Sequence, residues 1–251
     1  MNFALVQETL ERPSVEALQR AFQMSKIFTS YDAHILSKDA FGILARRLTR
    51  EQAMQLTHDL ARAGITGVRP VEERALPQTP PAKILNKLEC HPDCLRIFDA
   101  IGRPIDVAWG HLWLVTSGQV MESGFERKSV PIPSWNQAGP DGVPIVDTEV
   151  RVRERLSERM VLDLVLRAGV IRYSLNLELF LFETLGERRT GDLVRDLAEL
   201  IRDFRSHAPG CWLNQGAESL LKQPAQAVSY PSRSAYIEEM IWTLWRMNQS
   251  G

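Results

Sequence analysis

The chain has 251 residues, of which 44% are hydrophobic and 24% are charged, and its 30 Lys and Arg side chains are balanced by 31 Asp and Glu. This composition is typical of a globular protein and excludes a disordered, a collagen-like or a disulfide-stabilised small protein. The balance holds to within one charge in each of the segments 1–76, 77–130, 131–189 and 190–251. Because nucleic acids and anionic membranes are bound through clustered cations, we expect neither as a partner.

The sequence indicates no targeting or membrane-spanning segment. Residues 1–13 lack a charged leader with an apolar stretch behind it, and no run approaches the ~20 apolar residues that a spanning helix needs. Three cysteines do not make an even disulfide framework, and they fit a reducing compartment. We therefore expect a cytoplasmic protein.

Residues 1–76 alternate between strand and helix patterns. The first strand places Phe3 and Leu5 on one face, and Thr49 with Gln52 three residues later is the capping-box signature of a helix start. No glycine-rich turn follows the first strand, so no dinucleotide cofactor is expected. These patterns predict a small ferredoxin-like βαβαβ domain with its helices on one face. The expected order is strand 2–7, helix 14–25, short helix 30–38, strand 41–48, helix 50–63 and strand 65–72.

A proline-rich linker at 77–82 follows and predicts a domain boundary. Beyond it the patterns are mostly those of strands, and then a helix with apolar residues at three-and-four spacing occupies 191–206. The expected strands are 83–90, 94–99, 104–109, 112–117, 160–167 and 170–185.

Short antiparallel strands that end in one amphipathic helix are the plan of a pleckstrin-homology-like barrel, here predicted for 83–206. The runs IDVAWGHLWLVTSG and LFLFETLGERRTGDLVRDLAELIRDF resemble bacterial members of the PH/GRAM-like superfamily and uncharacterised bacterial proteins built around such a barrel. The resemblance implies a binding or scaffold role and no catalysis. Where the best-known members bind phosphoinositide head groups with basic loop residues, this chain has only Lys83, Lys87 and Arg103.

The barrel is expected to carry a mobile insertion at about 127–150. Six of the fourteen residues in 131–144 are Pro or Gly, a density that predicts irregular structure. Trp135 lies in its middle. Its ring could anchor a partner or fold back on the barrel, and the sequence leaves both open.

The remaining residues, 207–251, predict a loop and a last helix at 232–247. Trp245 lies on its apolar face and Trp242 lies beside that face. Packing within the chain is one interpretation. The other is a partner groove or a homo-oligomer interface, so both tryptophans are candidate partner-binding residues.

The motif Cys90-His91-Pro-Asp-Cys94 brings two thiols and an imidazole into five residues. Three residues separate the cysteines, where zinc sites usually have two, and Cys211 is distant. We interpret the motif as a hairpin turn whose cysteines face each other across the ladder, reduced or reversibly paired. A metal site is the alternative interpretation.

His111 is expected on one strand face with Trp109 and Trp113, as part of an aromatic cluster. We find no nucleophile elbow, no His-Glu-x-x-His and no phosphate-binding loop, so we expect no catalytic residue, cofactor or metal. The function predicted is that of a non-catalytic cytoplasmic binding or scaffold protein that contacts a protein partner or a second copy of itself. Alternatives are a metal protein or enzyme that uses Cys90, His91 and Cys94 with His111, or a peripheral membrane adaptor.

Overall fold

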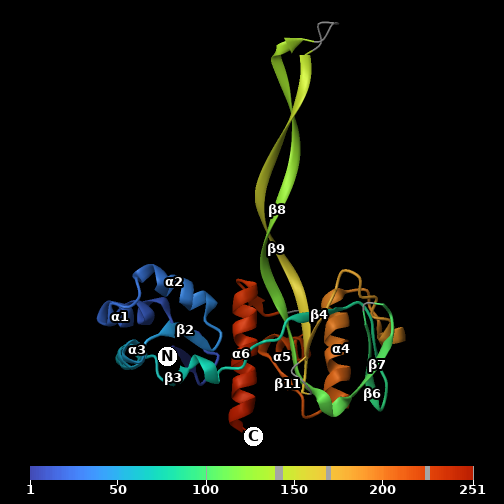
Figure 1. Cartoon of the computed structure of the whole chain (residues 1–251). Coiled ribbons are helices and arrows are strands. Elements are labelled where there is room, and N and C mark those ends of the chain that lie inside the picture. Colours follow the sequence, from blue (N-terminus) through green and yellow to red (C-terminus); the bar gives the residue numbers. More distant parts are fainter. Residues whose placement is uncertain (100, 139–143, 168–170, 224–226, 251) are drawn as a thin grey trace. The chain divides into compact units, whose positions relative to one another are not determined.

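A computed structural model describes residues 1–99, 101–138, 144–167, 171–223 and 227–250, with side chains left out at 125–128, 130–138, 144–154 and 250. These residues form a mixed α/β fold with three sheets (Figure 1). It divides into two compact units, one made of Met1–Val120 with Met160–Gly251 and one made of Met121–Arg159. The domain boundary expected at 77–82 stays a prediction.

The first sheet has β1 (Phe3–Gln7) between β2 (Ile43–Leu48) and β3 (Val68–Glu72), and both neighbours run antiparallel to β1. Leu5 packs with α1 (Val15–Ser25), α2 (Ser30–Asp39) and α3 (Arg50–Arg62), whereas Ala4 and Val6 belong to a cluster on the other face. The predicted alternation along the first strand is confirmed. The predicted capping box is confirmed as well, because Thr49 and Gln52 exchange side-chain hydrogen bonds at the start of α3.

The predicted ferredoxin-like topology is not what the strands form. In that fold the strand after the first helix runs parallel to the first strand, with another strand between them. Here two helices, α1 and α2, separate β1 from β2, and β2 returns directly beside β1 in the antiparallel sense. The N-terminal part is therefore a three-stranded antiparallel sheet.

The predicted barrel is also corrected, because the described strands do not close. A six-stranded sheet has the order β11-β8-β9-β10-β4, with β12 paired to β8, and it ends in β4 at one edge. The predicted strand 83–90 divides between β4, in this sheet, and β5, in a separate antiparallel sheet of β5, β6 and β7. The predicted strand 170–185 ends early, at Leu175. The bounds are β4 (Ala82–Leu85), β5 (Leu88–Cys90), β6 (Cys94–Phe98), β7 (Pro104–Ala108), β8 (Leu112–Ala138), β9 (Pro144–Leu166), β10 (Ile171–Leu175), β11 (Trp212–Leu213) and β12 (Ser229–Tyr230).

The segment predicted as an irregular insertion is instead strand in its described part. β8 and β9 continue through it as a twisted two-stranded ribbon, and 139–143 lie outside the described residues (Figure 1). Within the described residues, β10, β11 and β12 pair with β8 and β9 only at residues 114–120 and 163–166. In the ribbon each strand is therefore an edge strand, where a proline can lack its N–H without breaking the ladder. This is why Pro131 and Pro133 did not prevent strand structure.

Helix α6 (Arg233–Ser250) packs on the six-stranded sheet and on the sheet of β1, β2 and β3. Tyr236, Met240 and Leu244 lie in a cluster with Leu114, Val120, Val161 and Val165 of β8 and β9. Trp245 lies in the cluster that contains Ala4 and Val6 of β1. Helix α4 (Leu193–His207) and helix α5 (Gln215–Lys222) pack against each other in a further hydrophobic cluster. Helix α5 lies where the sequence predicted only a loop, at 207–231.

A buried polar network connects α6 to β8, α5 and β12. Asn214 caps α5 by accepting from the Ala217 N–H, and it also bonds both backbone polar groups of Ser117, at 2.9 and 3.0 Å. Its Nδ2 donates to the Tyr230 hydroxyl at 2.9 Å, and Tyr230 in turn donates to Glu239, whose side chain is fully buried. Burial raises the pKa of Glu239, so its proton is held more firmly in the folded chain.

Replacing Tyr230 with Phe tests this network. The change leaves Glu239 and Asn214 each without one partner, and a buried polar group without its hydrogen bond costs about 1–3 kcal/mol. We expect the free energy of unfolding, measured by urea denaturation, to fall by about that amount. Tyr31→Phe is the matched control, because Tyr31 is 72% exposed, and it should leave the unfolding midpoint unchanged. Equal midpoints for both variants would contradict a stabilising role of the network.

Candidate functional site

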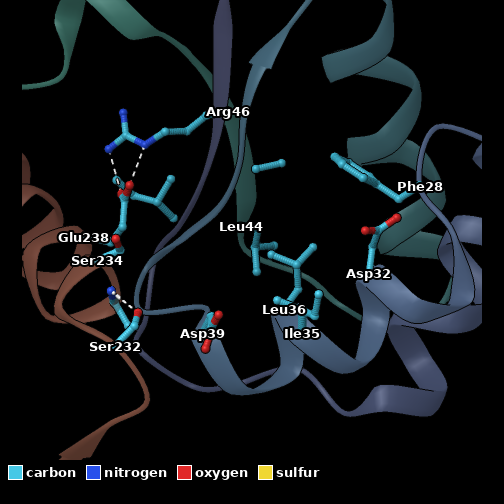
Figure 2. Close-up of a pocket in the computed structure, with 13 residues that line it drawn as sticks. Phe28, Asp32, Ile35, Leu36, Asp39, Leu44, Arg46, Ser232, Ser234 and Glu238 are labelled. Atoms are coloured by element: carbon cyan, nitrogen blue, oxygen red, sulfur yellow. Dashed lines mark hydrogen bonds and ion pairs between the residues drawn. The ribbon is translucent and has the colours of Figure 1, made fainter. Parts of the chain in front are cut away.

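A pocket of about 330 Å³ lies between α2, β2 and the start of α6 (Figure 2). Leu36 and Leu44 lie in its middle, with Arg46 and Glu238 at one end and Phe28 and Asp32 at the other. The pocket therefore has an apolar centre and a charged group at each end. Its other lining residues are Ile35, Asp39, Ile43, Ala45, Ser232, Ser234 and Ala235.

The Arg46 end depends on an irregularity in β2. Phe3 pairs with Leu48 but Leu5 pairs with Ala45, so β2 has one extra residue here. Arg47, in this bulge, has φ +58°, in the left-handed region that non-glycine residues rarely adopt. A bulge changes the direction of neighbouring side chains. Arg46 reaches α6 and donates twice to Glu238, from Nε to Oε1 at 2.8 Å and from Nη2 to Oε2 at 2.6 Å.

The other end of the pocket carries the Asp32 carboxylate of α2. Thr29, the N-cap of α2, donates its N–H and its hydroxyl to Oδ2 of Asp32, both at 2.7 Å. The backbone hydrogen bond, followed by the hydroxyl bond, lowers the pKa of Asp32, which keeps the carboxylate ionised. Asp39, the last residue of α2, also lines the pocket. Burial raises the pKa of its carboxyl group, while the charges of Arg12 and Lys38 oppose that rise.

The exposed face of α2 extends the apolar surface beside the pocket. Ala33 is the only fully buried residue of this helix. Ile35 lines the pocket and is 40% exposed, and Tyr31, one turn earlier on the same helix side, is exposed as well. Large apolar side chains at this spacing would be expected in a core, but here they face solvent.

The Cys90-to-Cys94 motif forms the β5–β6 turn, closed by a 3.0 Å hydrogen bond from the His91 N–H to the Cys94 carbonyl. Its cysteines do not face each other, because Cys90 pairs with Leu95. All three cysteines of the chain are free thiols. In the described part of the chain no three His, Cys, Asp or Glu side chains are grouped to hold a metal ion.

The predicted cluster of Trp109, His111 and Trp113 on one strand face is wrong, and Trp109 instead contacts a different histidine. Residues Trp109–His111 make a 3₁₀ turn before β8 begins, and this turn leaves His111 exposed while Trp109 is buried. The Trp109 ring stacks on His207, with centroids 4.8 Å apart and planes at 10°, and its Nε1 donates to the His91 carbonyl at 2.9 Å. Residue spacing along one strand could not indicate this contact from α4.

The candidate partner-binding tryptophans of α6 pack inside the chain. The Trp242 Nε1 donates to the Gln7 carbonyl at 2.7 Å, and its ring fills space that a Cβ at Gly42 would enter. Trp245 is buried, with the Arg69 guanidinium 4.5 Å from the centre of its ring. Trp135 lies in β8 where side chains are not described.

Comparison of the chain with protein-family models, with curated proteins and with solved structures gives no match in any of the three. No helix in the described residues is long and apolar enough to cross a membrane.

No residue of this pocket was identified from the sequence as a candidate site residue. Arg46 and Glu238 are 192 positions apart, and no local pattern connects them. One signal was present. The helix predicted at 30–38 has no continuous apolar stripe, which is unusual for a helix that only packs on a core.

The reactivity of the half-buried Cys90 and the buried Cys211 can be tested. Burial raises the pKa of Cys90 to about 12 and that of Cys211 to about 11. Because the thiolate is the reactive form, we expect both to react slowly with a thiol reagent in the folded protein at pH 8, and quickly after unfolding. Labelling followed by peptide mass spectrometry measures this. Rapid labelling of the half-buried Cys90 in the folded protein would contradict its raised pKa.

Proposed function

We propose that this chain is a non-catalytic binding protein that acts through protein contacts, and that an apolar side chain of its partner enters the pocket between α2, β2 and α6. The carrying observation is that the apolar centre of the pocket continues onto exposed Ile35 and Tyr31 of α2. A cytoplasmic location, expected from the cysteine content, is part of the same proposal.

The dimensions of the pocket support an anchor of this kind. A volume of about 330 Å³ accommodates one or two large apolar side chains. Fully burying a Leu, Ile or Phe side chain contributes roughly 1.5–3 kcal/mol. Protein interfaces draw much of their binding energy from such anchors in well-packed pockets, surrounded by polar groups that exclude water. The polar residues at the two ends of this pocket are placed to exclude water from the anchor in this way.

The pocket also has a rigid frame, which favours binding without rearrangement. Leu44 is 3% exposed and belongs to the core of the N-terminal sheet. The bidentate Arg46–Glu238 pair connects β2 to α6 across one end. A preformed site loses less conformational entropy when a ligand binds.

Binding of short peptides tests the proposal. An array of ten-residue peptides with Leu, Ile or Phe at the centre should contain members that bind the full chain, and the same array with Ser at the centre should not. Ile35→Asp places a charge at the pocket and should weaken binding at least tenfold, a loss of about 1.4 kcal/mol. Affinities are measured by fluorescence anisotropy.

Ile101→Asp is the matched control, because Ile101 is 74% exposed and does not line the pocket. It should bind the selected peptides as the unmodified chain does. Equal loss in the two variants, or an array with no binding peptide, would contradict the proposal.

A further inference from the structure

We infer that the partner segment carries a lysine or arginine next to its apolar anchor, and that this cation binds at Asp32. The inference rests on the proposed function and identifies the chemistry of the ligand. It comes from the unequal charge of the two ends of the pocket.

Three carboxylates and one guanidinium line the pocket. The guanidinium of Arg46 is engaged by Glu238 through two hydrogen bonds, so this end is already neutralised. Asp39 lies near the charges of Arg12 and Lys38, which act on its pKa. Asp32 differs from Asp39, because no Lys or Arg of the described chain acts on its carboxylate, either through an ion pair or through a nearby charge. The excess negative charge of the pocket is therefore concentrated at Asp32.

One oxygen of Asp32 is available for a ligand. Both hydrogen bonds from Thr29 go to Oδ2, and within the described residues Oδ1 accepts none. Figure 2 shows the carboxylate beside the apolar centre formed by Leu36 and Leu44. A cation bound at Oδ1 thus lies next to the place of the anchor.

Phe28 provides a surface for the stem of the basic side chain. It lines the same end of the pocket, and its ring contacts Phe22 of the core with centroids 5.1 Å apart, which holds it in place. The aliphatic stems of Lys and Arg pack on apolar surface while the charged group reaches a polar partner. A ring face also attracts the cation itself.

The ligand inferred is a peptide segment, since the apolar surface continues past the pocket along α2 to Tyr31. A small amine with an apolar body, such as 3-methylbutylamine, carries the same two groups without that length. It should compete only at concentrations far above those of the peptide. Competition at equal concentration would overturn the assignment to a peptide.

The experiment compares three forms of one peptide selected from the array, with Lys, norleucine or Glu beside the anchor. An exposed ion pair contributes little free energy, so Lys should bind about 1.4- to fivefold more tightly than norleucine, and Glu more weakly than either. The preference should decrease as salt is raised. In Asp32→Asn it should disappear, because the amide keeps the cap acceptor but lacks the charge.

Two further variants distinguish loss of cation binding at Asp32 from a general destabilisation of α2. Thr29→Ala breaks the same cap and leaves the carboxylate, so the Lys preference should persist. Glu51→Gln removes a carboxylate from the first turn of α3, outside the pocket lining, and should also leave the Lys preference unchanged. Binding by the anchor with no preference among Lys, norleucine and Glu would overturn this inference and leave the proposed function standing. If no form binds the unmodified chain, the proposed function itself fails.

Discussion

The hydrogen bond from the Tyr230 hydroxyl to the buried carboxyl group of Glu239 is the interaction on which the rest of the structure depends. Glu239 also accepts from the backbone N–H of Gln215, at the start of α5, at 2.7 Å. Asn214 extends the network to Ser117 of β8. The network thus connects α6 to α5 and β12, which precede it in the sequence, and to β8, which is distant in the sequence.

The position of α6 then determines the candidate site. Successive residues of a helix point about 100° apart, so Glu238 and Glu239 cannot face the same neighbour. Glu239 faces the buried network, and Glu238 faces Arg46 at the pocket. The same helix places Trp242 and Trp245 against the N-terminal sheet. A buried carboxyl group is costly unless its hydrogen bonds are complete, and here that requirement also fixes one wall of the pocket.

Two glycines make the network sterically feasible. A Cβ at Gly118 would lie 2.2 Å from the Tyr230 ring, and a Cβ at Gly216 would lie 1.8 Å from the Ser117 carbonyl oxygen. Neither glycine has an unusual φ in this structure, so their role is close approach and not backbone conformation. The sequence carries no local sign of this, since each glycine contacts a residue that is distant along the chain.

Local patterns predicted local structure well. The capping box at Thr49, the alternation of Phe3 and Leu5, and the helix near 191–206 depend on neighbouring residues, and the structure contains all three. Strand partners depend on distant residues, and there the predictions were wrong. The return of β2 beside β1, the open sheet and the ribbon through Pro131 and Pro133 are determined by tertiary pairing. The pocket was missed for the same reason, because it joins α2 to α6.

Backbone hydrogen exchange in Asn214→Ala tests the central claim most directly. This variant removes the side chain that bonds Ser117, Ala217 and Tyr230. If the network holds α6 in place, the amides of α5, of α6 and of β2, which packs on α6, should lose protection together. Loss of protection confined to α5, with α6 and β2 unchanged, would show that Asn214 is only a helix cap and would contradict this account.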